Sequence, residues 1–101
     1  MASETYFALG ARVRFNPEWC DETLARMLGL TTEDVTRINA LVGTVVEVDD
    51  SPRECAYYTV AWDGAAWGNP TQRLLSMLSS VEPCADGRIT SCEQSDALLP
   101  A

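Results

Sequence analysis

The middle of the chain carries two neighbouring runs of residues that suit β-strands. Residues 41–48 (LVGTVVEV) are rich in β-branched side chains, which favour a pleated strand, and they end at the turn-forming cluster 49–52 (DDSP). Residues 55–62 (CAYYTVAW) place alternate side chains on opposite faces and end at the turn signal Asp63-Gly64. Two such runs joined by a short turn predict a β-hairpin, which constrains the chain to a mainly β fold.

The segment before this hairpin combines a strand pattern with two helix patterns. Residues 10–15 alternate between small or apolar side chains and arginines, which predicts a half-buried first strand. An Asn-Pro pair then favours a helix start, and residues 18–28 predict a first short helix. Residues 32–40 carry apolar side chains at helical spacing and predict a second helix. We therefore expect a two-helix insertion, residues 16–40, between the first two strands.

The last third of the chain carries weaker patterns. Residues 72–78 suit either a strand or a helical turn, and residues 81–83 (VEP) predict a short final strand that proline ends. From Cys84 onward neither period continues, so residues 84–101 are expected to be a loosely ordered tail. A chain of 101 residues has room for one small domain, which we place at residues 1–83.

Four segments together resemble a known group of small β-domains. They are residues 10–15 (GARVRF), 43–49 (GTVVEVD), 58–64 (YTVAWDG) and 81–83 (VEP). Their pattern is similar to that of the SH3-like barrel group, which includes tudor-like and KOW-like modules. The resemblance implies a five-stranded SH3-like barrel, with the helical insertion in place of a shorter first loop. It implies little about function, because this barrel hosts many unrelated tasks.

The net charge of the chain limits the classes of molecule that it can bind. The chain has 7 basic and 15 acidic residues and no histidine, for a net charge of −8. An acidic surface repels phosphate backbones and anionic lipids, which argues against direct binding to nucleic acid or a membrane surface. The chain also has no apolar stretch near the ~20 residues that span a bilayer and no signal-peptide pattern, so we expect a cytoplasmic protein.

The sequence contains no arrangement of residues that indicates catalysis or a cofactor site. There is no histidine to act as a base or metal ligand, no Gly-rich phosphate loop and no recognisable nucleophile setting. The four cysteines form no C-x-x-C pair, and we expect free thiols; Cys84 and Cys92 would close the shortest disulfide loop. We therefore expect no enzyme, no cofactor and no metal site.

Exposed helices and aromatic residues suggest a protein-binding surface. Small apolar helices on a barrel bury little area by themselves, so a protein partner or a homodimer is expected to cover them. The expected contact residues are Trp19, Glu22, Arg26 and Val35 of the insertion, with Tyr57, Trp62, Asp63 and Trp67 around the Asp-Gly turn.

The aromatic residues near the turn have two interpretations. In tudor-like modules such rings form a cage for methylated Lys or Arg, with an acidic neighbour such as Asp63. In the alternative, Tyr58 and Trp62 cover the core while Tyr57 and Trp67 lie on the surface.

The acidic residues support an alternative function. Dense negative charge can imitate a nucleic-acid backbone, so the protein could act as an acidic inhibitor of a nucleic-acid-binding enzyme, of the anti-restriction or anti-CRISPR type found in phages and mobile elements. An ordinary solvated acidic surface is the simpler interpretation. The residues of this candidate acidic patch are Glu18, Asp21, Glu33, Asp34, Asp49 and Asp50.

Overall fold

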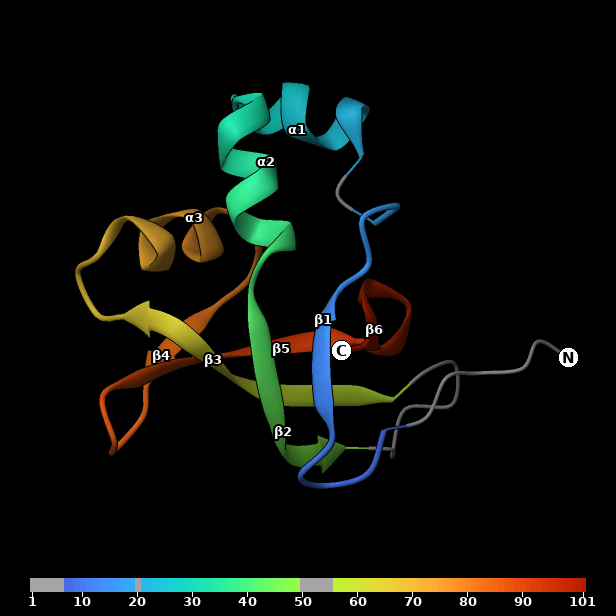
Figure 1. Cartoon of the computed structure of the whole chain (residues 1–101), viewed down its shortest axis with the longest axis vertical. Helices are drawn as coiled ribbons and strands as arrows, with labels where there is room; N and C mark the ends of the chain where they lie inside the picture. The colour runs from blue at the N-terminus through green and yellow to red at the C-terminus, as the bar shows by residue number, and fades with distance from the viewer. Residues whose placement is uncertain (1–6, 20, 50–55) are drawn as a thin grey trace, which may run out of the picture.

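The chain forms one antiparallel sheet with three helices, seen in a computed structural model that describes residues 7–19, 21–49 and 56–101 (Figure 1). The prediction of a mainly β protein is confirmed. In chain order the elements are β1 (Arg12–Phe15), α1 (Glu22–Leu28), α2 (Thr32–Asn39), β2 (Val42–Asp49), β3 (Tyr57–Ala66), α3 (Pro70–Leu78), β4 (Val81–Pro83), β5 (Arg88–Gln94), the 3-10 helix η1 (Ser95–Ala97) and β6 (Leu98–Pro100).

The strands lie in the order β4-β5-β3-β2-β1-β6. The sheet is strongly twisted: in Figure 1, β1 and β2 run vertically while β3 and β5 cross the view. Register shifts between Val45 and Glu47 of β2, and between Trp62 and Ala66 of β3, mark irregular pairing, a feature that increases local twist. The helices α1 and α2 project beyond one end of β1 and β2, as the predicted two-helix insertion.

The predicted five-stranded barrel is wrong in its strand count and closure. The described residues form six strands, and the sheet does not close. The segment 72–78 belongs to the helix α3, which begins after Asn69; the side chain of Asn69 accepts a hydrogen bond from the backbone N–H of Gln72. The Asp63-Gly64 pair is not the predicted turn, because β3 continues through it to Ala66.

The predicted loosely ordered tail is also wrong. Residues 88–94 form β5, which pairs with β3 along its length, and β6 returns to pair with β1. The inward-facing residues of β5 are Ile89, Ser91 and Glu93. Two of these three are polar, so the strand lacks the apolar alternation by which a buried strand is recognised.

The first helix is shorter than predicted. The N-cap of α1 is Asp21, whose side chain accepts a hydrogen bond from the backbone N–H of Leu24. The predicted start at residue 16 forms a local turn instead, in which the Asn16 side chain accepts from the backbone N–H of Glu18. The second helix matches its predicted range closely, and Thr31 and Asp34 form a capping box at its start.

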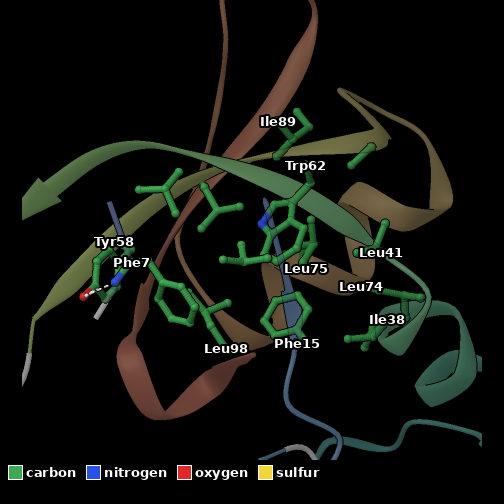
Figure 2. Packing of buried hydrophobic residues seen from close by; sticks show 14 residues of the cluster. Phe7, Phe15, Ile38, Leu41, Tyr58, Trp62, Leu74, Leu75, Ile89 and Leu98 are labelled. Carbon is green, nitrogen blue, oxygen red and sulfur yellow. Dashed lines mark hydrogen bonds between the residues drawn. The ribbon is translucent and has the colours of Figure 1, made fainter. Parts of the chain in front are cut away.

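The core is built around Trp62. Its ring is fully buried and stacks on Phe15, with ring centroids 4.5 Å apart and planes 12° apart (Figure 2). Gly43 of β2 lies opposite Trp62 in the sheet register. A Cβ atom at residue 43 would lie 2.5 Å from Val60 Cγ1 and 2.8 Å from Trp62 Cε3. Glycine is therefore needed at this position because a side chain would occupy the space of the core.

We expect Gly43→Ala to destabilise the fold by about 1–3 kcal/mol, the usual cost of overpacking a core. The measurement is urea unfolding followed by tryptophan fluorescence. Val46→Ala, at an exposed position of the same strand, is the control and should change the unfolding free energy much less. Equal stability of Gly43→Ala and the natural protein would contradict this packing.

The pairing of β6 with β1 generates a second prediction. Leu98 is buried in the core while its neighbour Leu99 is half-buried. Leu98→Ala should cost about 2–5 kcal/mol of stability through the cavity it leaves. Leu99→Ala should cost nearer to about 1 kcal/mol because it loses less buried apolar area. Similar small losses for both variants, measured by thermal or urea unfolding, would indicate a loosely held C-terminal segment.

Candidate functional site

The structure divides the predicted contact residues among separate places. Glu22, Arg26 and Val35 meet in a groove between α1 and α2, with a volume of about 370 Å³. We call this the α1–α2 groove. Its lining residues are Asp21, Glu22, Ala25, Arg26, Leu30, Thr31, Thr32 and Val35.

The α1–α2 groove has apolar side chains between polar margins. Ala25, Leu30 and Val35 supply the apolar surface. Arg26 and Glu22 form an ion pair at 3.2 Å, with both side chains at least three-quarters exposed. A pair this exposed contributes little to stability, so both charges can rearrange when a partner approaches.

Asp63 of β3 is held by arginines from two other strands, the adjacent β5 and the more distant β1. Its carboxylate accepts hydrogen bonds from Arg12 of β1 at 2.7 Å and from Arg88 of β5 at 3.4 Å. The hydrogen bond from Arg12 is the largest effect and holds the pKa of Asp63 below its usual value. Arg88 also pairs with Asp86 and lowers the pKa of Asp86 to about 2. Asp63 therefore links strands of the sheet.

The aromatic residues near Asp63 do not form a cage. Tyr58 and Trp62 are fully buried, so the predicted role of Trp62 in direct partner contact is wrong. Tyr57 is half-buried, and Trp67 is 61% exposed. This arrangement confirms the alternative interpretation, in which the first two rings belong to the core and the other two lie at the surface.

The predicted acidic patch is not continuous. Glu18, Asp21, Glu33 and Asp34 belong to the insertion, whereas Asp49 ends β2. The eight residues of β2 place Asp49 roughly 23 Å along the strand from the insertion. Asp50 lies outside the described residues. Asp21 and Asp34 also cap α1 and α2, so part of the acidic charge stabilises the helices.

A second pocket contains two of the predicted contact residues, Trp19 and Tyr57. Its volume is about 260 Å³. It also contains Glu93, which the sequence analysis did not single out, and we call it the Glu93 pocket. Its lining residues are Trp19, Tyr57, Leu78, Ser79, Ser80, Cys92, Glu93, Gln94 and Ala97.

Glu93 is a buried carboxylate, 3% exposed. Its Oε2 accepts a hydrogen bond from Ser91 Oγ at 2.6 Å, and Ser91 Oγ accepts one from Trp62 Nε1 at 2.8 Å. Burial raises the pKa of Glu93, and hydrogen bonds from Ser91 and Ser79 partly offset this effect. In the part of the chain that the structure describes, Glu93 makes no ion pair.

Cys92 lines this pocket and carries a free thiol. Cys84 is also free, so the two cysteines are not joined to each other. Burial, with the nearby negative charge of Glu93, raises the pKa of Cys92. This thiol is therefore a weaker nucleophile at neutral pH than an ordinary one, because less of it is thiolate.

Residues 7–19, 21–49 and 56–101 contain no group of three or more His, Cys, Asp or Glu side chains placed to hold a metal ion. None of their helices is both long enough and apolar enough to cross a membrane.

Comparison of the chain with protein-family models, curated proteins and solved structures finds no match. We therefore infer function from the geometry of the α1–α2 groove and the Glu93 pocket.

The raised pKa of Glu93 predicts a pH dependence of stability. A carboxyl with a raised folded-state pKa contributes stability below its unfolded pKa and loses that contribution as pH rises through the folded value. Glu93→Gln should therefore become more stable relative to the natural protein as pH rises from about 4 to 7. Urea unfolding at several pH values measures this difference.

Cys92 shares the pocket, and its raised pKa keeps the thiol protonated over this pH range. Glu82→Gln, at an exposed position on β4, is the matched control and should show no such trend. A constant difference between Glu93→Gln and the natural protein would show that Glu93 titrates as in the unfolded chain.

Proposed function

We propose that this protein is a non-catalytic protein-binding module whose α1–α2 groove takes a basic amphipathic segment of a partner. The observation that carries the proposal is the groove itself, which presents apolar side chains beside Asp21 and Glu22 on helices that project from the sheet. Helix-in-groove recognition uses this combination of apolar anchors and a polar margin.

Charge complementarity favours a basic partner segment. The insertion, residues 16–40, contains five acidic residues and two arginines, and the whole chain has a net charge of −8. Such a field attracts Lys and Arg and speeds association, while the apolar side chains of the groove hold the bound segment. The exposed Met27 of α1, 77% exposed, adds apolar surface to the same insertion.

The scaffold also supports this proposal. We propose that the chain belongs to the SH3-like group, with β4 as an addition to the five strands β6, β1, β2, β3 and β5, which lie in that order. In chain order the first strand, β1, pairs with the last, β6, so the insertion extends from a connected sheet. Binding functions concentrate in such loops because the sheet holds them in place.

The acidic-inhibitor alternative is less well supported by the geometry. Mimicry of a phosphate track calls for a row of charges, whereas the acidic residues of the insertion and Asp49 lie at opposite ends of β2. A partner that recognises only charge would also have no use for the apolar groove.

The test is affinity capture from a lysate of the source cell with two variants of matched charge. Val35→Asp places a carboxylate in the groove, and Thr36→Asp places one on the next, exposed residue of α2. We expect Val35→Asp to lose the captured partner while Thr36→Asp keeps it. A synthetic peptide of the partner's basic segment should then bind Val35→Asp at least about tenfold more weakly in calorimetry, as expected for a disrupted central contact.

The salt dependence of binding distinguishes the protein-binding module from the acidic inhibitor. Binding in the groove should weaken only in part between roughly 50 and 500 mM salt, because apolar contact is not screened. Complete loss in high salt, with Val35→Asp behaving as the natural protein, would favour the charge-mimic function. Circular dichroism of both variants controls for folding. Self-association that Val35→Asp abolishes would identify the occupant as a second copy and overturn the basic-partner proposal.

A further inference from the structure

We infer that the Glu93 pocket binds a primary alkylammonium group, with Glu93 as the anion and Trp19 and Tyr57 as the aromatic walls. The inference stands on a different cavity from the α1–α2 groove and does not depend on the proposed function.

The pocket lining includes a buried carboxyl, that of Glu93. Burying a charged carboxyl is costly unless a counter-charge or several hydrogen bonds compensate. Glu93 receives hydrogen bonds from the hydroxyls of Ser91 and Ser79. A carboxylate has about four acceptor positions, so these two donors leave capacity for an N–H donor. No arginine of the described residues pairs with Glu93, and Glu93 is among the residues that line the pocket.

The pocket lining also includes two aromatic side chains, Trp19 and Tyr57. A cation is attracted to the faces of Trp and Tyr rings. Trp19 is held by stacking on Phe15, with ring centroids 5.8 Å apart and planes 15° apart. Tyr57 is held through its hydroxyl, which accepts a hydrogen bond from Gln94 Nε2 at 3.0 Å. Both rings are therefore positioned before a ligand arrives, which reduces the entropic cost of binding.

A chain of side-chain contacts connects Trp19 with Glu93 through the core. Trp19 stacks on Phe15, Phe15 stacks on Trp62, and Trp62 donates to Ser91, which in turn donates to Glu93. The aromatic wall and the carboxylate thus share one anchor in the core. Such support holds binding groups in a fixed geometry.

The chemistry of the lining selects the class of ligand. Glu93 repels anions, and one carboxylate without further metal-ligating neighbours is a poor metal site. A volume of about 260 Å³ is smaller than the range of about 300–1,000 Å³ usual for drug-sized ligands. Ser79, Ser80 and Glu93 offer oxygen acceptors. A primary ammonium, which has three N–H donors, satisfies these acceptors, whereas a quaternary ammonium has none.

The experiment is an NMR titration of the full ¹⁵N-labelled chain with n-butylammonium chloride. We expect saturable shifts of the Trp19 indole N–H and of the Cys92, Glu93 and Gln94 amides. The neutral control, 1-butanol, has the same alkyl chain and should produce no saturable shift at equal concentration. Tetramethylammonium chloride should bind at least about tenfold more weakly, because it cannot donate the charge-assisted hydrogen bonds.

Two variants test the role of the carboxylate. Glu93→Gln keeps the shape of the side chain and should weaken n-butylammonium binding at least about tenfold through loss of the charge. Glu82→Gln removes an equal charge from exposed β4 and should leave binding unchanged. Tyr57→Leu, which removes one aromatic wall without touching Glu93, is a second variant and should also weaken binding. Unchanged spectra outside the pocket control for folding.

A second ligand, the capped peptide acetyl-Gly-Lys-Gly-amide, distinguishes a lysine side chain from a small free amine as the source of the ammonium group. If the peptide binds at least as well as n-butylammonium, the site takes lysine side chains; if only the free amine binds, it takes small amines. Equal shifts with 1-butanol, equal binding by Glu93→Gln, or no saturable shift with either amine would overturn the inference.

Discussion

Trp62 is the residue on which the rest of this structure depends. Its buried ring stacks on Phe15 of β1, and its Nε1 donates to Ser91 of β5, so one side chain connects three strands. The absence of a side chain at Gly43 gives the ring its space on β2. Because aromatic rings bury large apolar areas, this contact supplies much of the core's packing. Through Phe15 and Ser91, Trp62 also positions Trp19 and Glu93 of the Glu93 pocket.

Two carboxylates show how environment divides roles in a small acidic protein. Asp63 lies at the surface beside two arginines, and its pKa is lowered chiefly by the hydrogen bond from Arg12. Glu93 lies in the interior without a counter-ion in the described chain, and burial raises its pKa. The first carboxylate finds its cation within the fold and links strands. The second finds no cation among the described residues, and its pocket is the one for which we propose an ammonium ligand.

The two cavities arise where additions to the sheet meet the sheet or each other. The α1–α2 groove lies within the insertion after β1. The Glu93 pocket lies where the segment before α1, the end of α3 and β5 come together. A sheet anchored by a rigid core can carry such additions at little cost to its own pairing, and binding residues commonly collect there. The two proposed sites are therefore independent: one offers apolar surface with exposed charge, and the other offers a single buried charge.

Local patterns in the sequence were sufficient for part of this architecture. The hairpin of β2 and β3, the first strand and the two inserted helices follow from side-chain alternation and from helix spacing and capping, which act over a few residues. The groove residues Glu22, Arg26 and Val35 followed from the same helices. Only the tertiary structure decided the rest. The strand β5 exists because long-range pairing with β3 outweighs its weak apolar pattern, since Ser91 and Glu93 face inward. The fold also brings Glu93 and Trp19, far apart in sequence, into one pocket, and it buries Trp62, which removes that ring from direct partner contact. Contacts of this kind depend on which segments meet in space, and no local period in the sequence records them.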